Sequence, residues 1–151
     1  MRLISPHTLI SVLVKDQDEA LKFYTEVLGL ETRKDITFGP GLRLLTVAPA
    51  GQQKPELALA VPDASLYGEA YVHQLTQQLE QKVASIFVTN DCQKSYISLS
   101  ERGVIFVHAP RSQEYGVEAI FRDPDGNIYS LLETTVSVHV LLKNIFAKTA
   151  A

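Results

Sequence analysis

Cysteine is nearly absent from this sequence, since Cys92 is the only one among 151 residues. A single cysteine excludes a disulfide within the chain and excludes zinc sites that need several thiolates. The residues around Cys92 provide no context for a catalytic nucleophile. We therefore interpret Cys92 as an ordinary packing residue.

Long hydrophobic runs and basic clusters are also missing. No apolar stretch reaches the ~18 residues that indicate a membrane-spanning helix, and residues 1–11 lack the apolar core and cleavage site of a secretion signal. The net charge is −3, with acidic and basic residues interspersed, so no basic stripe is available to neutralise a row of phosphates. These absences predict a cytoplasmic protein with no nucleic-acid or membrane partner.

The hydrophobic content of 46% is enough for one compact domain. Apolar and polar residues are interleaved over residues 7–14, which predicts a half-buried strand. Asp16 or Asp18 is placed to cap a helix over residues 18–28, where apolar side chains recur at helical spacing. Gly29 is suited to end that helix because glycine adopts the left-handed conformation readily.

Three strand-like runs follow the helix, separated by the turn-forming stretches "TFGPG" and "PAGQQK". Residues 7–62 therefore predict a β-α-β-β-β module. Adding 75 to a residue number maps five landmarks onto counterparts: Asp16 to Asp91, Leu21 to Tyr96, Gly41 to Gly116, Pro49 to Pro124 and Gly51 to Gly126. This register predicts an internal duplication, with a second module over residues 83–134 and both modules in a single domain over residues 1–151.

Two further helices are expected outside the modules. Leu66, Ala70, Tyr71, Leu75 and Leu79 lie close to a helical stripe, which favours a linking helix over residues 63–82, with a loose linker as the alternative. In the tail over residues 135–151, apolar residues from Val138 to Phe146 predict an amphipathic C-terminal helix. That helix would cover a sheet edge or core patch, or would form a dimer contact or a lid.

The segments "FYTEVLGL" (residues 23–30) and "FRDPDGN" (residues 121–127), carried by paired β-α-β-β-β modules, resemble the vicinal oxygen chelate superfamily. This superfamily includes glyoxalase I, bleomycin-resistance proteins and extradiol dioxygenases, and the likeness covers roughly residues 7–134. It implies an α+β fold in which the modules form a curved mixed sheet around a small-molecule pocket. From its residue types, "DPDG" itself reads as a structural turn. The fold leaves the chemistry open, because one fold carries many functions.

The resemblance also implies where a catalytic metal would bind, with one ligand on the first and fourth strands of each module. On the first strands these positions hold Leu9 and Ala84, which have no donor atom. On the last strand the expected carboxylate is replaced by Ser130. The nearby His7 shares a face with Leu9 but lies about 7 Å further along the strand.

On the fourth strand of the first module, Glu56, Ala58 and Ala60 share a face, and only Glu56 offers a metal ligand. We therefore expect no metal cofactor. The alternative is a divalent metal ion held by a shifted ligand set that includes His7 and Glu56.

Without a metal, the predicted pocket is mostly small and apolar, which suits an apolar or aromatic ligand held by a few polar groups. Arg43 is a candidate partner for an anionic ligand, or else a solvated strand charge, and Tyr115 is a hydrogen-bonding candidate at the pocket mouth. The predicted lining residues are Leu9, Ser11, Arg43, Ala58, Ala60, Ala84, Ile86, Tyr115 and Ser130.

Two functions follow as hypotheses. The preferred one is a bleomycin-resistance-like homodimer that binds a small molecule without a catalytic metal. The alternative is an enzyme: a metal-dependent lyase or dioxygenase that uses His7 and Glu56, or a metal-free isomerase with Glu118 as its base.

Overall fold

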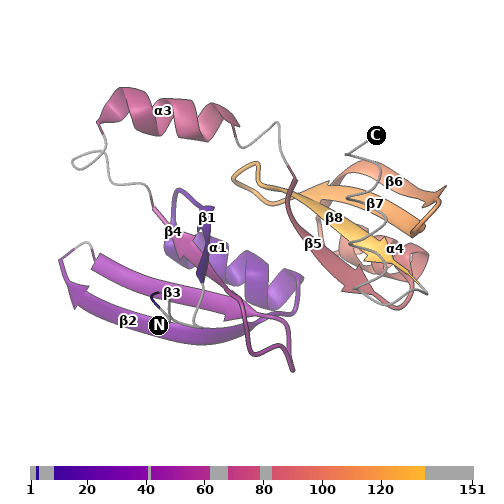
Figure 1. Cartoon of the computed structure of the whole chain (residues 1–151), viewed down its shortest axis with the longest axis horizontal. Coiled ribbons are helices and arrows are strands. Elements are labelled where there is room, and N and C mark those ends of the chain that lie inside the picture. Colours follow the sequence, from indigo (N-terminus) through magenta and orange to yellow (C-terminus); the bar gives the residue numbers. More distant parts are fainter. Residues whose placement is uncertain (1–2, 4–8, 41, 62–67, 79–82, 135–151) are drawn as a thin grey trace. The chain divides into compact units, whose positions relative to one another are not determined.

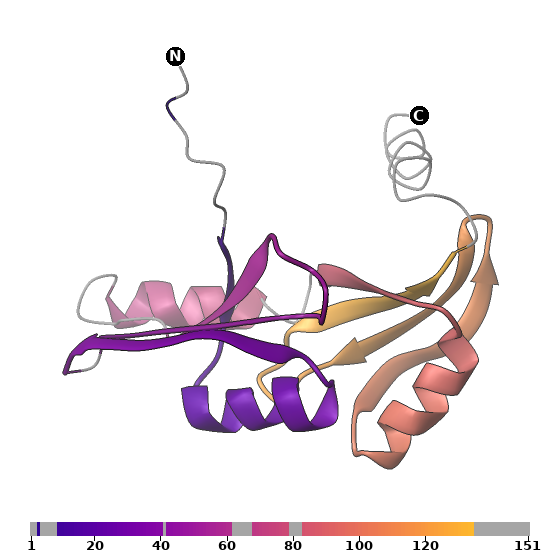
Figure 2. The same ribbon diagram turned by 90° about the horizontal axis from the view of Figure 1, so that it is seen from below.

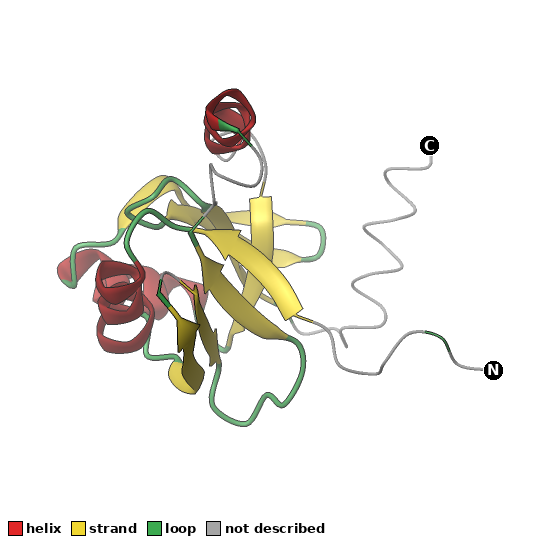
Figure 3. Cartoon of the chain, turned by 90° about the vertical axis from the view of Figure 1, so that its left-hand side faces the viewer, coloured by secondary structure: helices red, strands yellow, loops and turns green. Residues whose placement is uncertain are grey.

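The computed structural model describes residues 3, 9–40, 42–61, 68–78 and 83–134. These residues belong to two compact units. Unit 1 comprises Met1–Lys82 together with Asp123–Asn127, and unit 2 comprises Val83–Arg122 together with Ile128–Ala151. Each unit contains a four-stranded mixed sheet with a helix packed on it, so the described fold is α+β, as predicted (Figures 1 and 3).

Unit 1 contains one β-α-β-β-β module. Its elements are β1 (Leu9–Leu13), α1 (Gln17–Lys22), the π-helical turn η1 (Phe23–Val27), β2 (Glu31–Gly39), β3 (Leu42–Ala48) and β4 (Glu56–Ala60). The strands lie in the order β1-β4-β3-β2, with β1 parallel to β4 and the other pairs antiparallel. Helix α1 covers one face of this sheet (Figure 2), and the buried side chains include Val12, Leu45, Val47, Leu57 and Leu59.

The first helix is predicted over residues 18–28, and it forms as α1 (Gln17–Lys22) followed by the π-helical turn η1 (Phe23–Val27). Of the two cap candidates, Asp16 is the N-cap: its backbone is extended and its Oδ1 accepts a hydrogen bond from the amide of Glu19 at 3.0 Å. Gly29 follows the helix with φ of +80°, a conformation that glycine adopts without steric cost. The π-helical turn from Phe23 onward was not expected from the apolar spacing.

Unit 2 repeats the arrangement. Its elements are β5 (Val83–Thr89), α4 (Cys92–Glu101), β6 (Ile105–Gln113), β7 (Gly116–Arg122) and β8 (Ile128–Glu133). The strand order β5-β8-β7-β6 matches that of unit 1. Asp91 caps α4 as Asp16 caps α1, because its Oδ1 accepts from the amide of Lys94 at 3.0 Å. This equivalence agrees with the predicted duplication.

The linking segment contains helix α3 (Glu69–Gln78), within the range in which a helix was expected. The predicted C-terminal helix over residues 135–151 lies outside the described residues. None of the helices in the described ranges is long and apolar enough to span a membrane.

The "DPDG" turn belongs to unit 1, although in sequence it connects two strands of unit 2. The Tyr24 hydroxyl donates to Asp123 Oδ2 at 2.7 Å, and Asn127 Nδ2 donates to the carbonyl of Leu13 at 2.8 Å. The amide of Lys15 donates to Asp125 Oδ1 at 3.0 Å. The structural interpretation of this turn is therefore correct, but its contacts join it to the first module.

Candidate ligand-binding surface

The sheet of unit 1 has one face toward α1 and one face away from it. In the parallel pairing of β1 with β4, Leu9 lies beside Glu56 and Ser11 beside Ala58, so these side chains share the face away from α1. Leu9 is 47% exposed and Ser11 is also exposed. The structure thus brings four predicted lining residues together, and we call them the open face of unit 1: Leu9, Ser11, Ala58 and Ala60.

The carboxylate of Glu56 lies at the edge of this open face, where it forms hydrogen bonds with Thr46 and Lys34. Its Oε1 accepts a hydrogen bond from the Thr46 hydroxyl at 2.6 Å, and its two oxygens lie 2.8 and 2.7 Å from Lys34 Nζ. The hydrogen bond from Lys34, followed by that from Thr46, holds the pKa of Glu56 below its usual range. The sequence did not predict the contacts of Lys34 and Thr46 with Glu56, because these residues lie on β2 and β3 and meet β4 only through strand pairing.

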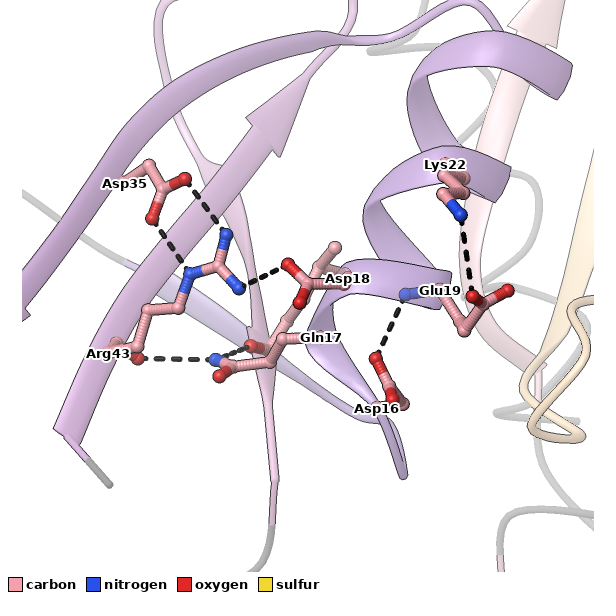
Figure 4. Close-up of polar contacts among 8 residues, drawn as sticks. Asp16, Gln17, Asp18, Glu19, Lys22, Asp35 and Arg43 are labelled. Carbon is pink, nitrogen blue, oxygen red and sulfur yellow. Dashed lines mark hydrogen bonds and ion pairs between the residues drawn. The ribbon is translucent and has the colours of Figure 1, made fainter. Parts of the chain in front are cut away.

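Arg43 points to the opposite face, toward α1 (Figure 4). Its Nε and Nη2 donate to the two carboxylate oxygens of Asp35 at 2.8 and 2.9 Å, and its Nη1 donates to Asp18 Oδ1 at 2.8 Å. These hydrogen bonds raise the pKa of Arg43, that with Asp35 most. Thr46 pairs with Ala58 and so shares the open face with it, whereas Arg43, three positions earlier on β3, faces the other side of the sheet. Arg43 therefore does not line the open face, contrary to the prediction.

The sheet of unit 2 also has a face away from its helix. Ser130 lies between Ile86 on β5 and Ile120 on β7, and its neighbour Leu132 lies beside Val88. Ile86 is 40% exposed and Val88 is 57% exposed. We call these five side chains, together with Glu118 and Tyr115, the open face of unit 2. The predicted lining residue Ala84 lies in β5, but its side chain is outside the described part of the structure.

The other face of β8 packs against α4. Cys92 Sγ donates to the carbonyl of Leu131 at 3.5 Å, and the amide of Cys92 donates to Glu133 Oε1 at 2.9 Å. Burial is the main cause that raises the pKa of the Cys92 thiol. Cys92 is fully buried, which agrees with its interpretation as a packing residue. Glu133 contacts Cys92 at the start of α4 and therefore faces away from Ser130.

Three polar residues form one hydrogen-bonded cluster on the open face of unit 2. The Ser130 hydroxyl donates to Glu118 Oε2 at 2.6 Å, and the Tyr115 hydroxyl donates to Glu118 Oε1 at 3.0 Å. Burial, followed by the hydrogen bond to Glu118 and the charge of that residue, raises the pKa of Tyr115. Ser130 itself is 2% exposed. All three residues were predicted separately, but their contact was not.

The described residues do not fit a catalytic divalent metal. Among them, no group of three His, Cys, Asp or Glu side chains lies close enough to hold a metal ion. Of the shifted ligand set, Glu56 is bound to Lys34 and Thr46, and His7 lies outside the described residues. No step of a reaction is therefore assigned to a metal.

Comparison with known proteins places these features in a family. Residues 5–131 match the Glyoxalase/Bleomycin resistance protein/Dioxygenase superfamily. The uncharacterized protein YurT of Bacillus subtilis (strain 168) is 32% identical over 129 residues, which cover 82% of this chain and 94% of that protein.

Two solved structures are similar in sequence and in fold. The crystal structure of UcmS2 has 34% identity and a TM-score of 0.77, with 87% of this chain and 98% of that chain covered. TnmS3, described as an antibiotic binding protein from Streptomyces sp. CB03234, has 30% identity and a TM-score of 0.69, with 89% and 100% covered. Together with the paired modules and their shared strand order, these matches show that the chain belongs to the glyoxalase/bleomycin resistance protein/dioxygenase superfamily.

Proposed function

We propose that this protein binds a small apolar or aromatic molecule and that it does so without a catalytic metal. The observation that carries the proposal is the open face of unit 2. There, the half-exposed Ile86 and Val88 lie beside a strand that also presents the Ser130–Glu118 hydrogen bond. Exposed apolar side chains around a few polar groups are the usual composition of a small-molecule site.

The similarity to TnmS3 supports the same function, since that protein is described as binding an antibiotic. The metal-free part of the proposal rests on the residues at the expected ligand positions. Leu9 has no donor atom, and the Ser130 hydroxyl is hydrogen-bonded to Glu118. Glu56, the remaining candidate that is described, already neutralises the Lys34 ammonium.

A thermal-shift screen against aromatic, quinone and antibiotic-like compounds tests the binding function. A ligand that binds only the native state stabilises it by about 2.7 kcal/mol at 100 times its Kd, so at least one compound is expected to raise the Tm. Ile86→Lys is expected to abolish that rise. Ile97→Lys is the matched control, because Ile97 is 49% exposed on α4 and lies away from the open face.

Metal analysis of the purified protein tests the alternative. Stoichiometric Ni, Zn, Fe or Mn that is lost in His7→Ala or Glu56→Ala would favour a metal-dependent lyase or dioxygenase-like enzyme. A screen without any stabilising compound would contradict the binding function. The homodimer and the cytoplasmic location expected from the sequence are part of this proposal.

A further inference from the structure

The cluster on the open face of unit 2 has an unequal supply of hydrogen-bond donors and acceptors. Ser130 and Tyr115 each have one hydroxyl hydrogen, and both hydrogens are donated to Glu118. A carboxylate has about four lone-pair sites and no hydrogen to donate. The two hydroxyls use two of these lone-pair sites. The cluster therefore has no hydrogen left to donate, and a ligand can bind to it only through the remaining acceptor lone pairs.

Apolar side chains surround this acceptor cluster. Ser130 lies between Ile86 and Ile120 in the sheet, and Glu118 lies beside Leu132. Glu118 and Tyr115 are partly exposed, so the unused lone pairs are within reach of a bound molecule. A ligand that covers the apolar residues without donating a hydrogen bond would remove water from these acceptors and leave them unsatisfied, which costs free energy.

The charge of Arg111 weakens the attraction that the Glu118 carboxylate exerts on a cationic donor. Arg111 lies directly opposite Glu118 across β6 and β7, is exposed, and forms no ion pair with any described residue. A cationic ligand at Glu118 would therefore be placed next to a second positive charge on the same face of the sheet, which opposes its binding.

We propose that Glu118, held in place by Ser130 and Tyr115, is the specificity residue that selects apolar aromatic ligands carrying a neutral hydrogen-bond donor such as a hydroxyl group. This inference rests on the proposed binding function and names the ligand class. It assigns Glu118 to recognition in place of the role of catalytic base.

Three naphthalene probes of similar size test this assignment at pH 7, with binding to the full chain measured by fluorescence or calorimetry. 2-Naphthol donates a hydrogen bond, 2-methoxynaphthalene does not, and 2-(aminomethyl)naphthalene is a cation. We expect 2-naphthol to bind at least about tenfold more tightly than either of the other two. Tenfold corresponds to about 1.4 kcal/mol, and a hydrogen bond to a charged group supplies at least this much.

Variants identify the residue responsible for this preference. Glu118→Gln replaces the carboxylate by a neutral amide with a single acceptor oxygen, and it is expected to reduce the preference for 2-naphthol while 2-methoxynaphthalene still binds as before. Glu101→Gln removes the same charge from the exposed surface of α4 and is expected to leave the preference unchanged. Ser130→Ala removes one of the two hydroxyls that hold Glu118 in place and is expected to reduce the preference for 2-naphthol, which provides a second measurement if Glu118→Gln folds poorly.

The outcomes separate this inference from the proposed function. Equal binding of the three probes, tighter binding of the cation, or an unchanged preference in Glu118→Gln would overturn the assignment of Glu118, while small-molecule binding would stand. Failure of every probe to bind would overturn the assignment as well. The binding function itself would then fail only if the wider compound screen also found no stabilising ligand.

Discussion

Asp123 is a charged residue that is only 3% exposed, and four donors hold its carboxylate. Oδ1 accepts from the amides of Asp125 and Asn127, and Oδ2 accepts from the Tyr24 hydroxyl and the Asn127 side chain. A buried carboxylate requires such partners, because its desolvation is otherwise very costly. The sequence indicates a turn here, but it does not show that Tyr24, 99 residues away, supplies one of the donors.

Replacement of Tyr24 by phenylalanine removes one of these donors and keeps the ring. We expect the free energy of unfolding to fall by about 1–3 kcal/mol, since a buried charged acceptor loses a partner. Urea denaturation measures the change. Tyr96→Phe is the control, with an expected change within about 0.5 kcal/mol, because the ring of Tyr96 packs edge-on against Phe106 and supplies no donor to a buried charge. Equal effects of the two substitutions would contradict the role of the Tyr24 hydroxyl.

The Arg43–Asp35 pair predicts a dependence of stability on pH. The hydrogen bond from Arg43 lowers the pKa of Asp35, so the folded state favours the ionised carboxylate more than the unfolded state does. This stabilisation is fully present above the unfolded pKa of about 3.9 and is lost as the pH falls through the lower folded value. The stability difference between the wild type and Asp35→Asn is therefore expected to be constant from about pH 7 to pH 5 and to shrink below about pH 4.

Urea titrations at several pH values measure that difference. A difference that grows as the pH falls would contradict the assigned pair.

Arg43→Met is expected to leave binding of any compound found by the thermal-shift screen unchanged, because Arg43 faces α1.

Gly116 determines how strand β7 begins. It has φ of +142°, and a Cβ built at this position would collide with the carbonyl oxygen of Glu133 on β8. The close approach of two strand backbones therefore requires glycine here. The sequence repeat marked Gly116 as the counterpart of Gly41, but it did not show why glycine is needed. The reason is the contact with Glu133, 17 residues further along the chain, which pairs with Val117.

Gly116→Ala is expected to destabilise the protein by about 1–3 kcal/mol or more, because the neighbouring backbone has to move. Gly39→Ala on β2 is the matched control, since nothing lies within 4 Å of a Cβ at that position. The midpoints of urea unfolding compare the two. A Gly116→Ala protein as stable as the control would contradict the close approach.

The helix caps were predictable and the π-helical turn was not. Caps depend on a few adjacent residues, so the sequence limited the first cap to Asp16 or Asp18, and the hydrogen bonds identify Asp16 and, in unit 2, its repeat counterpart Asp91. In the π-helical turn the amide of Leu28 donates to the carbonyl of Phe23, one residue further back than in an α-helix. Apolar spacing over so short a helix does not distinguish the two hydrogen-bond patterns.

One measurement tests the predicted homodimer together with the dimer-contact role of the predicted C-terminal helix. The apolar residues from Val138 to Phe146 would be covered in a dimer if this helix forms the contact. We expect the full chain to have twice the monomer mass by light scattering and the chain without residues 138–151 to have the monomer mass. A shortened chain that remains dimeric would place the contact elsewhere, and a monomeric full chain would contradict the homodimer.

Local spacing and residue type were enough to predict the two modules, the cap candidates Asp16 and Asp18, and the lack of a metal donor at Leu9. Which side chains meet became clear only from the fold. It joined Ser130 to Glu118 and Tyr115, and it turned Arg43 away toward α1. The physical reason is that strand register and the direction of each face are set by pairing between distant segments, and a shift of one residue reverses every side chain.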